Sequence, residues 1–163
     1  MTSEQPKRSA RLTTPSEHEI AVERVFDGPR ERVYAIFTEP ALIPAWWGPH
    51  GTTTTVDRMD VRAGGAWRFL SRDRDGTETG FRGVYHEIVP PERIVQTFEW
   101  EGMPGHISVE TATFEDLGER TKVTTVAHYD TTEERDGMLA SGMERGLNET
   151  YERLDALLAR LQG

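Results

Sequence analysis

The last thirty residues carry a regular apolar stripe, and this stripe limits the possible folds more than any other feature. Its members lie three or four positions apart, so that they share one side of an α-helix. They are Leu139, Met143, Leu147, Thr150, Tyr151, Leu154, Leu157, Leu158 and Leu161. Arg145, Glu149 and Arg153 fall on another side, at the i,i+4 spacing of helical ion pairs. The pattern predicts one helix from about Thr132 to Leu161, capped by Thr131 or Thr132, which needs an apolar surface to lie on.

Segments in which apolar and polar residues alternate supply that surface. Alternation with a period of two is typical of strands with one buried face. Residues 18–26 form the first such segment. Further candidates are Thr52 to Val61, Ala66 to Arg72, Thr79 to Ile88, Ile94 to Trp100, His106 to Phe114 and Lys122 to Tyr129. The links between these later strands are short and rich in Gly, Pro and Asp, as in 73–76 and 102–105. Links of this kind join antiparallel neighbours.

Two short helices are predicted between the first strand and the next. Asp27 or Gly28 can cap the first helix, Pro29 suits its first position, and Val33 and Ile36 recur at helical spacing. The second runs from Pro40 to Trp47 and ends at a Gly-Pro pair. The order of elements predicts an α+β fold. A curved antiparallel sheet of six to seven strands would surround the long C-terminal helix, with the two short helices after the first strand.

The chain of 163 residues has the length of one domain. Residues 1–17 contain Pro6 and Pro15 and show no period, so we expect a disordered arm there and a single domain over 18–163. The formal charge is -9, which disfavours nucleic acid and anionic membranes as partners. The sequence is compatible with a monomer and with a homodimer.

The sequence also excludes several kinds of chemistry and location. It contains no cysteine, which rules out thiolate nucleophiles and thiolate metal sites and fits a reducing compartment. No apolar run approaches the roughly 18 residues that span a bilayer, and the N-terminus lacks the apolar centre of a secretory signal. We therefore expect a soluble, cytoplasmic protein.

Several short motifs resemble the START-like superfamily. They are Val25-Phe26-Asp27-Gly28-Pro29-Arg30, Trp46-Trp47-Gly48-Pro49, Asp60-Val61-Arg62-Ala63-Gly64-Gly65-Ala66-Trp67, Gly83-Val84-Tyr85, Pro90-Pro91-Glu92-Arg93-Ile94-Val95 and Gly142-Met143. Within the superfamily they are similar to the branch of the C-terminal domain of the activator of the heat-shock protein 90 ATPase, which is also called polyketide-cyclase-like. The similarity covers about residues 18–162. It implies a helix-grip fold with a cavity between the long helix and the sheet, which binds hydrophobic molecules across the superfamily. This branch shares no catalytic motif, and a fold alone does not fix a function.

Acid–base and metal chemistry find little support in the sequence. The five histidines form neither a His-Glu-x-x-His motif nor an i,i+4 pair on a helix, so we predict no metal, no cofactor and no assigned catalytic residue. No serine lies in a Gly-x-Ser-x-Gly motif. His106 and His128, on neighbouring predicted strands, are retained as polar anchors for a ligand, with ordinary packed or exposed histidines as the simpler interpretation.

Aromatic and small residues point to a binding cavity instead. A packed core explains any single aromatic residue, but together they are dense in the middle strands and share faces there. Gly142 and Gly146 weaken a helix, which is compensated either by close packing against the sheet or by room for a ligand. The predicted ligand-binding residues are Trp46, Trp67, Phe69, Phe81, Tyr85, Phe98, Trp100, His106, His128, Met138, Gly142, Met143, Gly146 and Leu147.

Three hypotheses about function follow. The first is a carrier or sensor of a small hydrophobic or amphipathic molecule. The second is an enzyme of cyclase or aromatase type, in which His106, His128 or Glu99 would move protons on a polyketide-like substrate. The third is a module that interacts with heat-shock protein 90.

Overall fold

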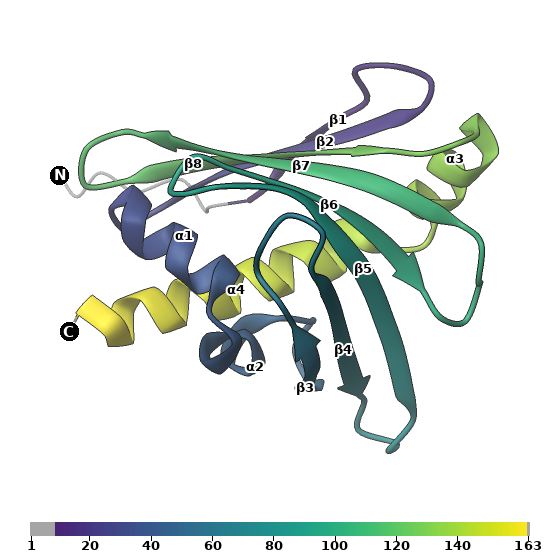
Figure 1. Ribbon diagram of the computed structural model, residues 1–163, viewed down its shortest axis with the longest axis horizontal. Coiled ribbons are helices and arrows are strands. Elements are labelled where there is room, and N and C mark those ends of the chain that lie inside the picture. Colours follow the sequence, from purple (N-terminus) through teal and green to yellow (C-terminus); the bar gives the residue numbers. More distant parts are fainter. Residues whose placement is uncertain (1–8, 163) are drawn as a thin grey trace, which may run out of the picture.

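A curved antiparallel sheet surrounds the C-terminal helix in the computed structural model, which describes residues 9–162 (Figure 1). In chain order the elements are β1 (Arg11–Thr13), β2 (Glu19–Phe26), α1 (Arg30–Thr38), the 3₁₀ turn η1 (Pro40–Leu42), α2 (Ile43–Trp46), β3 (Thr53–Met59), β4 (Ala66–Arg72), β5 (Glu78–Val89), β6 (Arg93–Trp100), β7 (Ile107–Asp116), β8 (Thr121–His128), α3 (Thr132–Ala140) and α4 (Met143–Gln162). The predicted α+β class and helix-grip architecture are confirmed.

The strands follow the order β1-β2-β8-β7-β6-β5-β4-β3, so consecutive strands from β3 to β8 are neighbours. All neighbouring pairs are antiparallel. Register shifts occur between Val56 and Arg58 on β3 and between Tyr85 and Glu87 on β5. Such bulges bend a strand and increase its twist. They contribute to the concave face along which α4 runs (Figure 1).

The sheet has eight strands, one more than the upper prediction of seven. The additional strand β1 falls within residues 1–17, for which a disordered arm was expected, so that prediction is wrong for Arg11–Thr13. Leu12 pairs with Val22 and packs against the core, and the backbone N–H of Ala10 donates a hydrogen bond of 2.9 Å to Asn148 Oδ1 on α4. A strand of three residues is too short to show a period. Residues 1–8 lie outside the described part of the chain.

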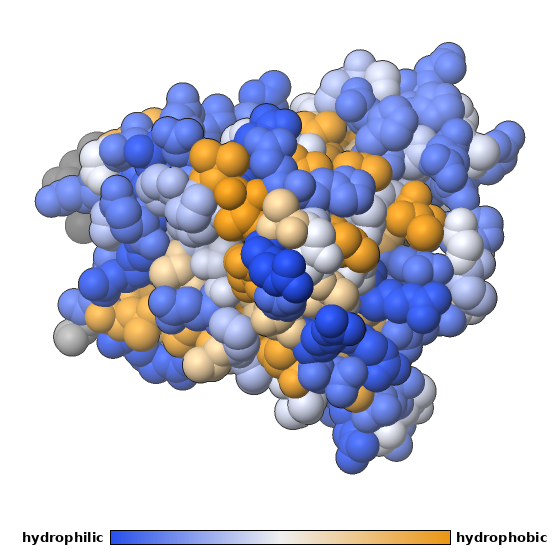
Figure 2. Space-filling model, viewed as in Figure 1, coloured by the Kyte–Doolittle hydropathy of each residue, from blue (hydrophilic) through white to orange (hydrophobic). Residues whose placement is uncertain are grey.

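The core lies between the sheet and α4. Tyr151, Leu154, Leu157 and Leu158 of α4 are buried, and the Tyr151 ring meets Phe26 of β2 edge to face, with their centroids 5.1 Å apart. Figure 2 shows polar and charged side chains over most of the viewed surface, with apolar residues gathered toward its middle. The predicted apolar stripe therefore finds the partner surface that it requires.

The predicted single helix from Thr132 to Leu161 is wrong, because the structure divides it into α3 and α4. Gly142 separates them with φ of +83°, a left-handed conformation that ends helices and favours glycine. The Ser141 hydroxyl donates to the Met138 carbonyl at 2.6 Å and closes the last turn of α3. Thr131 caps α3 as predicted, since its hydroxyl accepts a hydrogen bond from the Glu134 N–H.

The two early helices appear where the sequence predicted them, with small shifts. Pro29 precedes α1 as its N-cap and Arg30 is the first helical residue, so proline lies one position earlier than expected. The second predicted helix consists of η1 followed by the single turn α2. The Trp46 indole N–H donates to the Ile36 carbonyl at 3.2 Å, which ties α2 to α1 beside the core.

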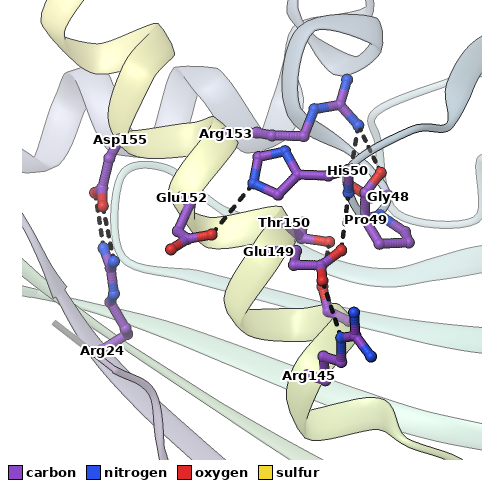
Figure 3. A network of polar contacts seen from close by, with 11 residues as sticks. Arg24, Gly48, Pro49, His50, Arg145, Glu149, Thr150, Glu152, Arg153 and Asp155 are labelled. Carbon is purple, nitrogen blue, oxygen red and sulfur yellow. Dashed lines mark hydrogen bonds and ion pairs between the residues drawn. The ribbon is translucent and has the colours of Figure 1, made fainter. Parts of the chain in front are cut away.

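An ion pair between a buried arginine and a half-buried aspartate attaches α4 to β2. The Arg24 guanidinium is 4% exposed, and it donates two hydrogen bonds of 2.7 Å each to the Asp155 carboxylate. Its carbon Cζ lies 4.7 Å from the centroid of the Phe26 ring, a cation–π distance. Figure 3 shows this pair on the β2 side of α4, with the contacts to residues 48–50 on another side of the helix.

Candidate functional site

A cavity of about 380 Å³ lies between α4 and the concave face of the sheet. This volume falls within the range of about 300 to 1,000 Å³ that is usual for small-molecule pockets. Aromatic side chains from α2, from residue 47 and from β4, β5 and β6 form much of its wall. They are Trp46, Trp47, Trp67, Phe69, Phe81, Tyr85 and Phe98. The aromatic surplus of the middle strands therefore surrounds open space as well as filling the core.

The alternation of β4 and the register of its neighbour place these rings. Trp67 and Phe69 share one face of β4, where they pair with Gly83 and Phe81 of β5. A Cβ atom at Gly83 would lie 2.5 Å from the Trp67 indole nitrogen and 2.0 Å from the Thr97 carbonyl oxygen. Only glycine leaves room for the indole to lie across β5. The ring centroids of Trp67 and Phe69 are 4.8 Å apart, which makes one continuous aromatic wall.

The loop after α2 closes one side of the cavity, and the polar face of α4 holds that loop. Arg153 donates a hydrogen bond of 2.9 Å to the Gly48 carbonyl, and Glu149 accepts one of 3.1 Å from the His50 backbone N–H. His50 Nε2 lies 3.2 Å from a Glu152 oxygen (Figure 3). Trp47, Gly48 and Pro49 of this loop line the cavity. One helix thus supplies the apolar wall with one face and fixes the rim with another.

A row of polar groups crosses the sheet at the cavity. Tyr85 of β5 pairs with Gln96 of β6, which pairs with Glu110 of β7. All three side chains line the cavity, together with Ser71, Thr125, Tyr129, Thr150 and Tyr151. An apolar cavity with a few polar groups at fixed places can orient a ligand as well as enclose it.

Glu110 is the acidic residue of the cavity wall, and its surroundings alter its ionisation. Burial among protein atoms raises the pKa of its carboxyl from 4.5 to about 7. Within residues 9–162 the carboxyl makes no hydrogen bond or ion pair. Burial also raises the pKa of Tyr85 and of Tyr129, and it raises that of Tyr151 to about 12, so these hydroxyls stay protonated near neutral pH.

The raised pKa of Glu110 predicts a pH-dependent loss of stability. Folding disfavours the charged carboxylate. The contribution of Glu110 to the free energy of unfolding is therefore most favourable below its unfolded pKa near 4.5, and it is lost as the pH rises through about 7. Glu110→Gln removes this titration. The variant should gain about 3 kcal/mol relative to the native protein between pH 4.5 and pH 8, measured by urea unfolding.

The control is Glu115→Gln, which changes an exposed carboxylate on the same strand in the same way. Its stability curve should run parallel to that of the native protein. A Glu110→Gln curve that is also parallel would show that the Glu110 carboxyl is well solvated and would contradict its raised pKa.

Most of the predicted ligand-binding residues line the cavity. They are Trp46, Trp67, Phe69, Phe81, Tyr85, Phe98, Met143, Gly146 and Leu147. A Cβ atom at Gly146 would meet no heavy atom within 4 Å, apart from the backbone of its own helix. Close packing is therefore the wrong explanation for Gly146, and the alternative of free space agrees with the structure.

The remaining predicted residues lie elsewhere. Trp100 pairs with Phe81, but it is the last residue of β6 and is 42% exposed beyond the cavity. His106 lies in the turn before β7 and pairs with Glu134 of α3. His128 is on the outer face of β8 and stacks on His18, with the ring centroids 5.7 Å apart. The prediction that these three side chains line the cavity is wrong.

Two further predicted residues belong to the break between the helices. Met138 packs against the core from α3 and does not line the cavity. Gly142 is exposed, and no heavy atom lies within 4 Å of its Cβ position. Neither close packing nor room for a ligand explains Gly142, which is required by the left-handed turn.

The sequence offered one signal for Glu110 that was not used. Ser108, Ala112 and Phe114 alternate inward along β7, and Glu110 has the same phase. A charged residue on the inner face of a strand is uncommon. The other lining residues that were not predicted include Trp47, Gln96, Tyr129 and Tyr151. Tyr151 was assigned to the apolar stripe of the helix, where it also belongs.

Residues 9–162 contain neither a cluster of metal ligands nor a membrane-spanning helix. No group of three or more His, Asp or Glu side chains in this range could hold a metal ion. None of the helices described here has the length and apolar character needed to cross a membrane.

The sequence matches one family model, and the fold matches several solved structures. The model of the family described as "Activator of Hsp90 ATPase homolog 1-like protein" matches residues 27–159. No curated protein matches the chain. A protein from Rhodobacter sphaeroides of known structure is 26% identical, with a TM-score of 0.87, over 93% of this chain and 99% of that one.

Two other solved structures show the same arrangement. A protein from Arthrobacter aurescens is 25% identical, with a TM-score of 0.85, over 92% of this chain and 91% of that one. An AHSA1 protein from Silicibacter pomeroyi is 22% identical, with a TM-score of 0.73, over 89% of this chain and 99% of that one, and this likeness concerns the fold alone.

Proposed function

The chain belongs to the family of Activator of Hsp90 ATPase homolog 1-like proteins, as its motifs predicted, and we propose that this member binds a small hydrophobic or amphipathic molecule between α4 and the sheet. The observation that carries the proposal is the cavity of about 380 Å³ with its aromatic wall. Protein interiors are close-packed, and voids larger than a water molecule are few. A space of this size among buried residues such as Trp67 and Tyr85 is room that the fold does not fill.

The positions of the polar side chains support ligand binding over the cyclase hypothesis. The cyclase hypothesis assigned proton transfer to His106, His128 or Glu99. None of them lines the cavity, and Glu99 is paired with Arg82 at 3.0 Å on the sheet and accepts a hydrogen bond from the Gly105 N–H. A carrier or sensor needs only enclosure and orientation, which the wall and the polar row can provide.

A pair of glycine substitutions tests the proposal. Gly146 lines the cavity from α4, whereas Gly137 is exposed on α3, and neither Cβ position has a heavy atom within 4 Å outside its own helix. Leucine at either position improves helix propensity by about 1 kcal/mol. Gly146→Leu, however, also places a side chain in the cavity, so it should weaken ligand binding while Gly137→Leu should leave binding unchanged.

The measurement is a thermal-shift screen with the neutral dye Nile red, steroids, lipids and aromatic polyketides. Compounds that shift the melting temperature are then titrated while tryptophan emission is recorded. A ligand at 100 times its Kd should stabilise the native protein and Gly137→Leu by about 2.7 kcal/mol. The same ligand should have little effect on Gly146→Leu. If no compound shifts the native protein, or if both variants respond as the native protein does, the proposal fails.

A further inference from the structure

We propose that the ligand carries a protonated amine, which the Glu110 carboxylate binds while the aromatic wall encloses the apolar remainder of the molecule. This inference rests on the proposed function and adds the chemical class of the ligand. It starts from the position of Glu110, opposite Gln96 in the polar row and among the residues that line the cavity.

The charge composition of the wall is the first argument. Within residues 9–162 the lining residues include no lysine, arginine or histidine, and Glu110 is the acidic residue among them. An anionic ligand would therefore meet a carboxyl group and find no cation there. A cationic ligand would supply the charge that the wall lacks. Faces of Trp, Tyr and Phe rings attract cations as well, and the cavity has such rings on α2, β4, β5 and β6.

The state of the Glu110 carboxyl is the second argument. It is half-buried in the cavity wall and has no hydrogen bond or ion pair inside the described range, and a carboxylate held among apolar groups in that state destabilises the fold. Its inward neighbours on β7, Ala112 and Phe114, show that apolar side chains fit this face. The fold gains nothing from a carboxylate here, whereas a bound ammonium group would pair with it in surroundings that strengthen the attraction.

Few other groups near Glu110 can titrate or carry charge. Tyr129 and Tyr151 interact electrostatically with it, and both stay neutral near pH 7 because burial raises their pKa values. Gln96 of β6 and Ala127 of β8, which pair with Glu110 across the sheet, carry no charge. Arg24 of β2 acts on Tyr151 but is paired with Asp155. Amine binding should thus follow the ionisation of Glu110.

Three naphthalene probes of matched shape test the inference. 2-(2-Naphthyl)ethylamine, 2-(2-naphthyl)ethanol and 2-naphthylacetic acid share the ring system and differ in the end group. Isothermal titration calorimetry at pH 8.5 should show the amine binding at least about 10-fold more tightly than the alcohol, with the acid weakest. From pH 5.5 to pH 8.5 the affinity for the amine should rise about 30-fold, because a carboxyl of pKa about 7 passes from almost wholly protonated to almost wholly ionised.

Two further readouts identify Glu110 as the partner. At pH 7 amine binding should release about half a proton, seen as a dependence of the binding enthalpy on the ionisation enthalpy of the buffer. In Glu110→Gln the amine should lose both its advantage over the alcohol and its pH dependence. A cooperative urea unfolding transition shows that the variant is folded.

The outcomes separate the two proposals. If the alcohol and Nile red bind but the amine has no advantage, or if the acid binds most tightly, the amine inference is overturned and the hydrophobic site stands. An amine preference that persists unchanged in Glu110→Gln overturns the role of Glu110. If neither the naphthalene probes nor Nile red bind, both proposals fail.

Discussion

A chain truncated after Gly142 is expected to lose cooperative unfolding altogether. The truncation removes α4, whose residues Tyr151, Leu154, Leu157 and Leu158 are at most 5% exposed. Burial of each such side chain stabilises the fold by about 1.5 to 3 kcal/mol, together about 6 to 12 kcal/mol. That sum is comparable to the whole stability of a domain, about 5 to 15 kcal/mol. Thermal melts followed by circular dichroism should show a broad, featureless change.

The control stays within the same helix. Leu161 is 42% exposed, so Leu161→Ala should change the free energy of unfolding by about 0.5 kcal/mol or less. Leu154→Ala, at a position with 0% exposure, should cost about 2 to 5 kcal/mol. A truncated chain that still melts sharply would show that the sheet and the early helices fold without α4, and it would contradict the role given to this helix.

Asp155→Asn is expected to cost about 3 kcal/mol, near the lower end of the range for breaking a buried ion pair. The substitution keeps the shape of the side chain but removes its charge, which leaves the Arg24 guanidinium buried at 4% exposure without its counter-ion. The Asp155 side chain is 35% exposed, so water can reach this end of the pair and reduce the loss. Urea unfolding at pH 7 measures the difference.

The matched control is Glu78→Gln, which removes the charge of an exposed carboxylate paired with Arg72 at 3.5 Å. Exposed pairs contribute about 0 to 1 kcal/mol, so this variant should be near neutral. The double variant Arg24→Met, Asp155→Leu should recover most of the loss, because an apolar pair can replace a buried ion pair. If Asp155→Asn costs no more than Glu78→Gln, the pair does not hold α4 to β2.

Much of this fold could be predicted because each strand from β2 to β8 carries its own alternation. The helical stripe likewise required a concave apolar surface, which the later strands supply. Local pattern could not reveal the division of that stripe. Apolar spacing continues from Leu139 through Met143 across the break, while the interruption depends on the left-handed conformation of Gly142. A glycine in a periodic segment is compatible with a continuous helix and with a break, and backbone geometry decides between them.

The candidate site divides in the same way. Phase along a strand identified Trp67, Phe81 and Phe98 as inward residues, and the structure agrees. Phase along a strand could not show where the cavity ends. Trp100 points to the same face of the sheet as Phe81, with which it pairs, and yet it lies outside the cavity. For His128 even the expected approach to the cavity was wrong, because its neighbour Ala127 takes the inward position of β8.

The sheet order also determines when this domain can close as the ribosome makes it. β2 pairs with β8, whose residues follow about a hundred positions later, and α4, which packs along the concave face, follows β8. Trp67 is made 87 residues before Leu154, a buried residue of α4, which at about 5 to 20 residues per second is roughly 4 to 17 seconds. Throughout that interval the aromatic wall of the nascent chain lacks the cover that α4 provides. Folding must therefore follow synthesis of the whole domain, and the growing chain is the form of this protein that most needs protection from aggregation.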